Sequence, residues 1–174
     1  MRKNNSGVTL IELLIVMAVI GILVVALGFS FEGWRGKYRI ESQTKEIYAD
    51  IMDARARAMT RHRAQFISLN ASQYTMYDDT DPAPDGDGVL DTGADALALP
   101  TPKAIAGYTI SIISCPSCAN LTLPKTVTVN VRGLLSPEMN LHINNTLQPD
   151  YDCIKISQLR VRMGKYNGTA CDDR

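Results

Sequence analysis

An uncharged apolar run near the N-terminus constrains this chain more than any other feature of its sequence. From Leu13 to Phe29 there are 17 residues without a charged side chain, and the short polar segment before them carries Arg2 and Lys3. Residues 8–29 as a helix would extend about 33 Å, which is enough to cross the hydrocarbon core of a bilayer. We therefore predict a transmembrane helix at residues 8–30, with the basic N-terminus in the cytoplasm and the rest of the chain outside.

A cleaved secretory signal peptide is the competing interpretation, because it also combines a basic start with an apolar run. Two features favour a retained helix instead. No small-x-small cleavage site follows the apolar run, and Glu12 places a carboxylate near its start, where a signal peptide gains nothing from one.

The string Gly7-Val8-Thr9-Leu10-Ile11-Glu12, together with the apolar residues 13–23, resembles the N-terminal signature of type IV pilins and of the pseudopilins of type II secretion. The resemblance implies that a prepilin peptidase cuts between Gly7 and Val8 on the cytoplasmic side and methylates the new N-terminus. Residues 1–7 would then be a leader. Val8 stands where phenylalanine is more usual in this family.

Glu12 would become the fifth residue of the mature chain. A carboxylate within a membrane is costly and usually faces a partner. The resemblance implies that this partner is the positive N-terminal amine of a neighbouring subunit, so that Glu12 sets the register of a helical filament. The alternative is that its side chain only reaches the cytoplasmic interface.

Beyond the apolar run, the helix is expected to continue as an amphipathic one. Apolar and small residues recur there at steps of three and four, which places them on one stripe of a helix. We predict a single helix from Thr9 to Arg63, with residues 31–63 as its amphipathic half. The stripe consists of Ile40, Thr44, Ile47, Ile51, Ala54 and Ala58.

Residues 64–174 are predicted to form a β-rich globular head. Short runs with β-branched residues and turn signals between them indicate antiparallel sheet. The fold class is therefore α+β, with a long N-terminal helix packed on an antiparallel sheet, as the pilin resemblance also implies. The expected strands are Gln65–Leu69, Gln73–Tyr77, Tyr108–Ile113, Thr126–Val131, Met139–Ile143, Cys153–Ser157 and Leu159–Met163.

Within the pilin group, the chain is similar to the GspH/FimT family of minor pseudopilins and minor pilins. The similarity rests on residues 53–59, 128–133 and 153–162 and on an aspartate-glycine insertion. It implies a minor subunit that primes or tips a type IV pilus or a type II secretion pseudopilus, with its head in the periplasm and other pilins as partners in the inner membrane. A major pilin is the alternative.

Seven aspartates and no basic residue occupy residues 78–95. Carboxylates that alternate with glycines suit the hard oxygen coordination of calcium, and the candidate ligands are Asp81, Asp85, Asp87 and Asp91. The spacing departs from an EF-hand, because Ala83 falls at the first ligand position and no glutamate closes the loop. The alternative is an exposed acidic turn that binds no metal.

The four cysteines are predicted to form disulfides, because the compartment outside the inner membrane is oxidising. Proximity in the sequence favours Cys115 with Cys118 and Cys153 with Cys171. A redox or zinc role for Cys115 and Cys118 is the alternative. No thioredoxin-like helix follows them, and a zinc site would need further ligands.

Some relatives in this family bind DNA for natural transformation through a glycine-arginine-x-arginine motif. Here Leu159 replaces the glycine, while Arg160 and Arg162 are kept. With Lys165, these arginines are the candidate DNA-binding residues, since phosphates are bound by such cations. The alternative is a charged sheet edge that blocks strand pairing.

Catalysis has little support in the sequence. There is no GxSxG, HExxH or phosphate-binding glycine loop, and the two histidines lack a recognisable nucleophile beside them. The 18 basic and 18 acidic residues cancel, which excludes a histone-like protein. We therefore expect a non-enzymatic subunit.

Overall fold

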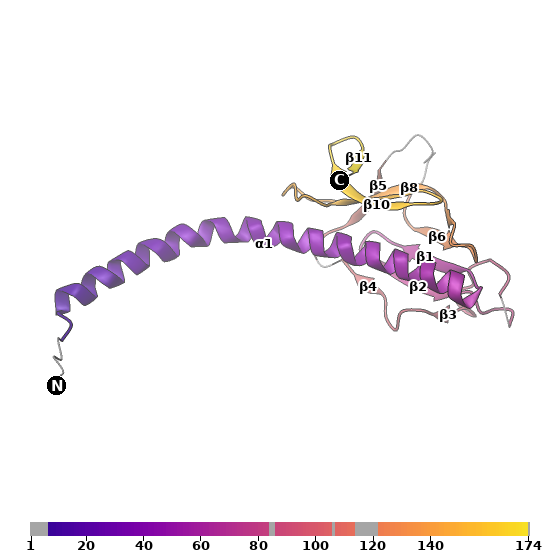
Figure 1. The fold of residues 1–174 in the computed structure, drawn as a ribbon, viewed down its shortest axis with the longest axis horizontal. Coiled ribbons are helices and arrows are strands. Elements are labelled where there is room, and N and C mark those ends of the chain that lie inside the picture. The colour runs from indigo at the N-terminus through magenta and orange to yellow at the C-terminus, as the bar shows by residue number, and fades with distance from the viewer. Residues whose placement is uncertain (1–6, 84–85, 106, 114–121, 174) are drawn as a thin grey trace, which may run out of the picture. The chain divides into compact units, whose positions relative to one another are not determined.

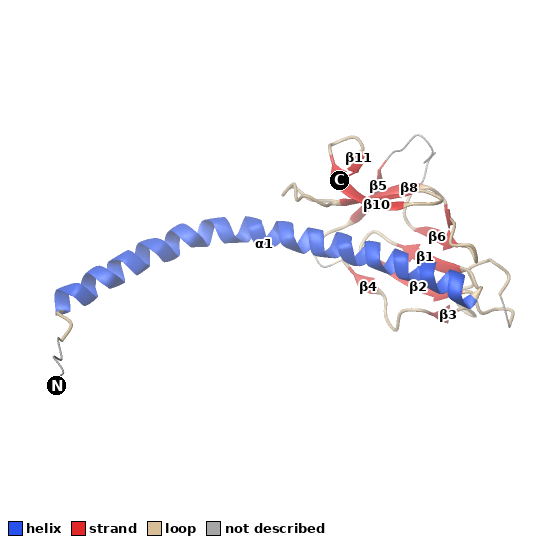
Figure 2. Cartoon of the chain, viewed as in Figure 1, coloured by secondary structure: helices blue, strands red, loops and turns tan. Residues whose placement is uncertain are grey.

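The computed structural model describes residues 7–83, 86–105, 107–113 and 122–173, with the side chains of residues 26–31 left out of the description. The chain divides into two compact units, Met1–Gly36 and Lys37–Arg174. One helix and eleven strands are assigned within the described residues, which confirms the α+β class (Figures 1 and 2).

A single helix, α1, runs from Leu10 to Arg61. It begins and ends within two residues of the bounds predicted from the sequence. In the N-terminal unit, the described side chains of α1 are exposed along their whole length. Among the residues that the structure describes, no helix combines the length and apolarity that a membrane crossing requires.

The predicted stripe of the helix is confirmed in the second unit. All six of its residues, from Ile40 to Ala58, are at most 2% exposed. Five of them share one apolar core with residues of both sheets, such as Ile67 and Leu141. The sixth, Thr44, keeps its hydroxyl satisfied by donating to the carbonyl of Ile40 at 2.9 Å, as a buried polar group on a helix must.

Two antiparallel sheets form the rest of this unit. In the larger sheet the strands lie in the order β3-β2-β1-β6-β7, and β4 also pairs with β2. The second sheet has the order β11-β10-β9-β8-β5. The bounds of the first sheet are β1 Gln65–Leu69, β2 Gln73–Asp78, β3 Ala96–Leu97, β4 Lys103–Ala104, β6 Lys125–Val129 and β7 Leu135–Ser136; those of the second are β5 Ile110–Ile113, β8 Met139–Ile143, β9 Cys153–Ile156, β10 Val161–Tyr166 and β11 Cys171–Asp173.

All seven predicted strands are present, two of them with the predicted bounds. The last is displaced, because the segment expected at Leu159–Met163 is a strand only from Val161 to Tyr166. The four strands that sequence reasoning missed, β3, β4, β7 and β11, have two or three residues each. Such short strands carry too few residues to show an alternating pattern, and their partners in the sheet define them.

Two arginines near the end of α1 join the helix to other parts of this unit. Arg55 donates to the carbonyl of Leu159 at 3.0 Å, in the turn between β9 and β10. Arg61 pairs with Asp78 at the end of β2, with a 2.5 Å separation between Nη1 and Oδ2. Each arginine therefore joins the helix to a different sheet.

Candidate functional site

The predicted processing site lies immediately before α1. Gly7 and Val8 are exposed and not helical, so the peptide bond between them is accessible to a protease. Thr9 is the N-cap of the helix: its Oγ1 accepts from the backbone N–H of Glu12 at 3.3 Å, and its carbonyl accepts from the N–H of Leu13 at 3.2 Å.

Glu12 belongs to a pattern at the helix start that sequence reasoning missed. It stands three residues after the capping threonine, in the Thr-x-x-Glu pattern of a capping box, where a carboxylate also interacts favourably with the positive end of the helix dipole. That pattern is visible in the sequence and could have been found. Its position in the first turn leaves the Glu12 carboxylate exposed, and the assembly role stays a prediction.

The three candidate DNA-binding residues are not presented as one basic face. Arg160 is exposed in the turn before β10. Arg162, on β10, pairs with Asp173 of β11, with Nη1 and Oδ2 2.5 Å apart. Lys165 lies three residues further along the strand, so it points to the opposite face from Arg162, and its cross-strand partner is Asp172.

The predicted disulfide between Cys153 and Cys171 is present, with 5.9 Å between the two Cα atoms. It joins β9 to β11, although β10 lies between these strands in the sheet. The C-terminal segment is therefore linked covalently to the sheet, as predicted. The other predicted pair, Cys115 with Cys118, lies outside the described residues.

Two buried aspartates organise the acidic loop after β2. Asp79 accepts from the backbone N–H groups of Asp87 (3.2 Å) and Gly88 (2.8 Å). Asp95 accepts from the N–H groups of Thr80 (3.0 Å), Asp81 (3.2 Å) and Asp91 (2.9 Å). These bonds join residues that are four to fifteen positions apart, so the two carboxylates hold the two ends of the loop together through its backbone N–H groups.

The two carboxylates differ in their electrostatics. Burial raises the pKa of Asp79, against the opposing effect of the N–H groups of Gly88 and Asp87. Burial alone would also raise the pKa of Asp95. The three backbone N–H groups that donate to its carboxylate have the larger effect and hold that pKa below its usual value. At Gly86, where φ is 80°, an added Cβ would overlap the Asp79 carboxyl group, so the loop requires glycine there.

Of the four candidate calcium ligands, Asp81, Asp87 and Asp91 are exposed, and Asp85 lies outside the described residues. Asp87 and Asp91 accept from the N–H groups of Val89 and Gly93, two residues on. Within the described parts of the chain, no group of three or more His, Cys, Asp and Glu side chains is placed to hold a metal ion. The calcium site stays a prediction.

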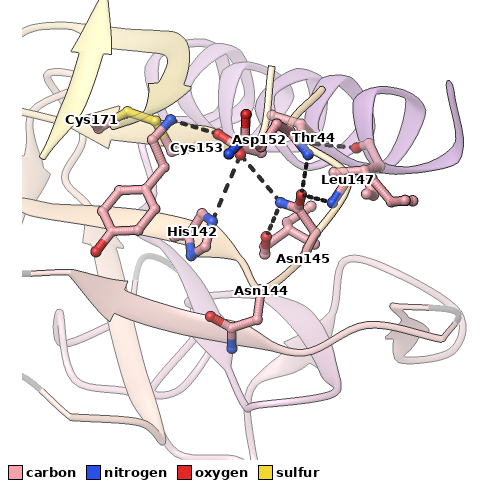
Figure 3. Close-up of polar contacts among 12 residues, drawn as sticks. Thr44, His142, Asn144, Asn145, Leu147, Asp152, Cys153 and Cys171 are labelled. Atoms are coloured by element: carbon pink, nitrogen blue, oxygen red, sulfur yellow. Dashed lines mark hydrogen bonds and ion pairs between the residues drawn. A yellow bond between two sulfur atoms is a disulfide. The ribbon is translucent and has the colours of Figure 1, made fainter. Parts of the chain in front are cut away.

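A polar cluster that sequence reasoning did not single out lies where β8 ends and β9 begins (Figure 3). Asp152, 3% exposed, accepts from the N–H of Tyr166 at 2.7 Å and from Nδ2 of Asn145 at 3.2 Å. His142, 7% exposed, has its Nε2 3.8 Å from Asp152 Oδ2 and its ring centroid 4.3 Å from that of Tyr166. His142 points away from the core, because Leu141 and Ile143 on either side of it face the core.

Burial alone would raise the pKa of Asp152, but His142, the N–H of Tyr166 and the Asn145 amide together hold it below its usual value. The same segment is held to α1, since the N–H of Asp150 donates to Glu41 at 3.0 Å. Nothing in the sequence pairs His142 with Asp152, which are ten positions apart. Strand pairing of β8 with β9 brings them together.

These features define a class of protein, an α+β chain with one long N-terminal helix. The first part of the helix is apolar and exposed and follows an accessible Gly–Val peptide, and its last part packs in the core of a β-rich unit. Residues 2–28 match the family model of the prokaryotic N-terminal methylation motif. That motif is the hallmark of type IV pilin-like substrates of the prepilin peptidase, and this chain carries it. No curated protein and no solved structure matches the chain.

Proposed function

We propose that this chain is a non-enzymatic minor pilin or pseudopilin subunit that primes or tips a type IV pilus or a type II secretion pseudopilus. The observation that carries the proposal is the methylation motif at the start of a helix whose other half is built into a β-rich unit. The resemblance of the head segments to the GspH/FimT family supports the minor rather than the major role.

In this proposal, the prepilin peptidase removes residues 1–7 and methylates the amine of Val8. The helix anchors the subunit in the inner membrane with its head in the periplasm. Exposed apolar side chains such as Leu10, Ile11 and Leu14, each at least 62% exposed, would be covered by lipid and by the helices of other pilins. Glu12 would neutralise the amine of the adjacent subunit and so set the axial register.

Replacement of Glu12 tests the assembly step. Glu12→Ala should be processed and inserted in the membrane as the natural chain is, but should fail to enter the filament. Glu32→Ala is the matched control, because it removes an exposed carboxylate from the same helix and should leave incorporation intact. Normal incorporation of Glu12→Ala would contradict the proposed role.

Scoring a deletion strain for secretion, surface pili and DNA uptake would identify the system.

A DNA-binding minor pilin for natural transformation is the alternative function. The exposed Arg160 supports it, whereas the pairing of Arg162 with Asp173 weakens it. If the alternative holds, the full chain in detergent micelles binds duplex DNA with an affinity that falls steeply with salt. Arg160→Ala with Arg162→Ala should then abolish binding, while Arg132→Ala, an exposed arginine in another turn, should not.

A further inference from the structure

Three segments of the second unit meet at the end of α1: the helix itself, the turn between β6 and β7, and the turn between β9 and β10. The first turn packs on the helix so closely that a Cβ added at Gly133 would lie 2.9 Å from the Sδ of Met59. The second turn is bonded to both neighbours. Its Leu159 carbonyl accepts from α1 at 3.0 Å, and its Gln158 carbonyl accepts from the N–H of Leu135 at 3.0 Å.

Each of these segments exposes an apolar side chain. Met59 is 44% exposed, Val131 45% and Leu159 63%. Arg132 and Arg160 follow two of them in the sequence and are exposed, and among the described residues neither guanidinium has a hydrogen bond or an ion pair. We call these five residues the basic patch. Apolar side chains gathered on one surface and rimmed by polar groups are typical of protein interaction sites.

The acidic loop after β2 presents the opposite charge around an apolar side chain. Val89 is 63% exposed, and Asp87 and Asp91 on either side of it are exposed as well. Each of the two carboxylates uses one oxygen for a backbone N–H two residues on, and among the described groups its second oxygen has no partner. Because Asp79 and Asp95 hold the loop through its backbone, these three residues have a fixed place in it. We call them the acidic tip.

We propose that the basic patch of one copy of this chain binds the acidic tip of a second copy. The two surfaces are complementary in charge, two arginines against two aspartates, and in their apolar centres. Both are exposed within one copy, so they do not cover each other there. Residues 78–95 contain seven aspartates and no basic residue, so the cations that neutralise the tip come from another segment. The inference goes beyond the proposed function, since it needs only two copies side by side, whichever filament they enter.

The contact is expected to depend on salt. Exposed charges are screened within roughly 8 Å at physiological ionic strength, so added salt weakens their attraction, whereas a contact between apolar side chains alone is not weakened in this way. Charges around a small apolar centre mainly determine which surfaces meet. Reversal of one set of charges should therefore weaken the contact strongly, and reversal of both sets should restore it.

Exchange of the charges between two copies tests the proposal. One variant carries Arg132→Glu with Arg160→Glu, and the other carries Asp87→Lys with Asp91→Lys. Each alone should self-associate at least about tenfold more weakly than the natural chain, because like charges then meet. An equimolar mixture should regain the association, since each altered surface then finds its complement. Sedimentation velocity of the full chain in micelles of a nonionic detergent measures this, with a chelator present because the two aspartates are also candidate calcium ligands.

Two further variants control for effects of substitution itself. Lys37→Glu with Lys155→Glu reverses two exposed cations outside the basic patch and should associate as the natural chain does. Asp87→Asn with Asp91→Asn keeps the side-chain oxygens that accept from the backbone of the loop. It should also weaken the association, so the loss does not come from a distorted loop.

Chemical crosslinking locates the contact. A copy with Leu159→Cys and a differently tagged copy with Val89→Cys should be joined by a short bismaleimide into a mixed dimer. A copy with Lys155→Cys in place of Leu159→Cys should not be joined, because that residue is exposed on β9 and lies outside the basic patch.

The proposal is overturned if the mixed charge-exchanged variants associate no better than each alone, if the natural chain does not associate, or if no mixed dimer is crosslinked. Binding of duplex DNA that depends on Arg160, without association between copies, would also overturn it and would favour the alternative function. None of these variants changes Glu12. The outcome for Glu12→Ala therefore tests the assembly role separately, and either proposal can fail without the other.

Discussion

The backbone of Gly164 passes so close to the carbonyl of Asp172 that no side chain fits between them. Gly164 is also the cross-strand partner of Cys153, and an added Cβ would lie 3.1 Å from the Sγ of Cys171. The disulfide that joins β9 to β11 thus crosses β10 at a position where that strand can have no side chain.

Gly164→Ala should therefore destabilise the protein, because backbone rather than a movable side chain blocks the new methyl group. Overpacking of this kind costs about 1–3 kcal/mol. Urea unfolding of the full chain measures it. Gly93→Ala is the control, since a Cβ there meets only Asp91 Oδ1 at an ordinary 3.5 Å. Equal stability of the two variants would contradict the predicted steric clash.

Removal of the disulfide should destabilise the chain through its unfolded state. Cys153 and Cys171 are 18 positions apart, and a loop of this size contributes about 3 kcal/mol in the chain-entropy model. We expect Cys153→Ser with Cys171→Ser to lower the free energy of unfolding by about this amount. Cys115→Ser with Cys118→Ser should lower it less, because that pair would close a much shorter loop. A larger loss from the second pair would argue against the entropic account.

Stability should depend on the ionisation of Asp152. Its pKa in the folded protein lies below the ordinary value of 3.8, so its contribution is complete above that pH and is lost as the pH falls through the folded pKa. Asp152→Asn should be less stable at neutral pH and should show a shallower loss of stability as the pH falls below 3.8. Thermal unfolding across this range is the measurement.

Asp53→Asn provides the control for that experiment. Asp53 is half-exposed on α1, and its substitution removes one negative charge, as Asp152→Asn does. Its loss of stability with acid should follow that of the natural chain. If Asp152→Asn loses stability with acid as steeply as the natural chain does, the buried cluster is not the source of the dependence.

The proposed calcium site makes a separate prediction. A bound ion stabilises the folded chain by mass action, so millimolar calcium should raise the melting temperature of the natural chain. Asp87→Asn with Asp91→Asn should remove this rise. The same melting temperature in calcium and in chelator would mean that the loop is a turn closed by Asp79 and Asp95 alone.

The sequence by itself determined the local features of this protein. The steps of three and four in residues 40–58 predicted which side of α1 is buried, because helix geometry alone relates those positions. The motif around Gly7 and Glu12 is likewise contiguous. The pairing of Cys153 with Cys171 could be predicted because the two residues are close in the sequence.

The tertiary structure alone decided what depends on pairing between distant segments. The sheets place β6 beside β1 and β8 beside β5, and no local pattern encodes those neighbours. Strand register brings Arg162 next to Asp173, so a residue predicted to bind DNA phosphates forms an ion pair within the protein. It also brings His142 next to Asp152, so a histidine with no role predicted from the sequence lines a pocket. Periodicity reports which face of an element is buried, whereas long-range pairing determines what that face meets.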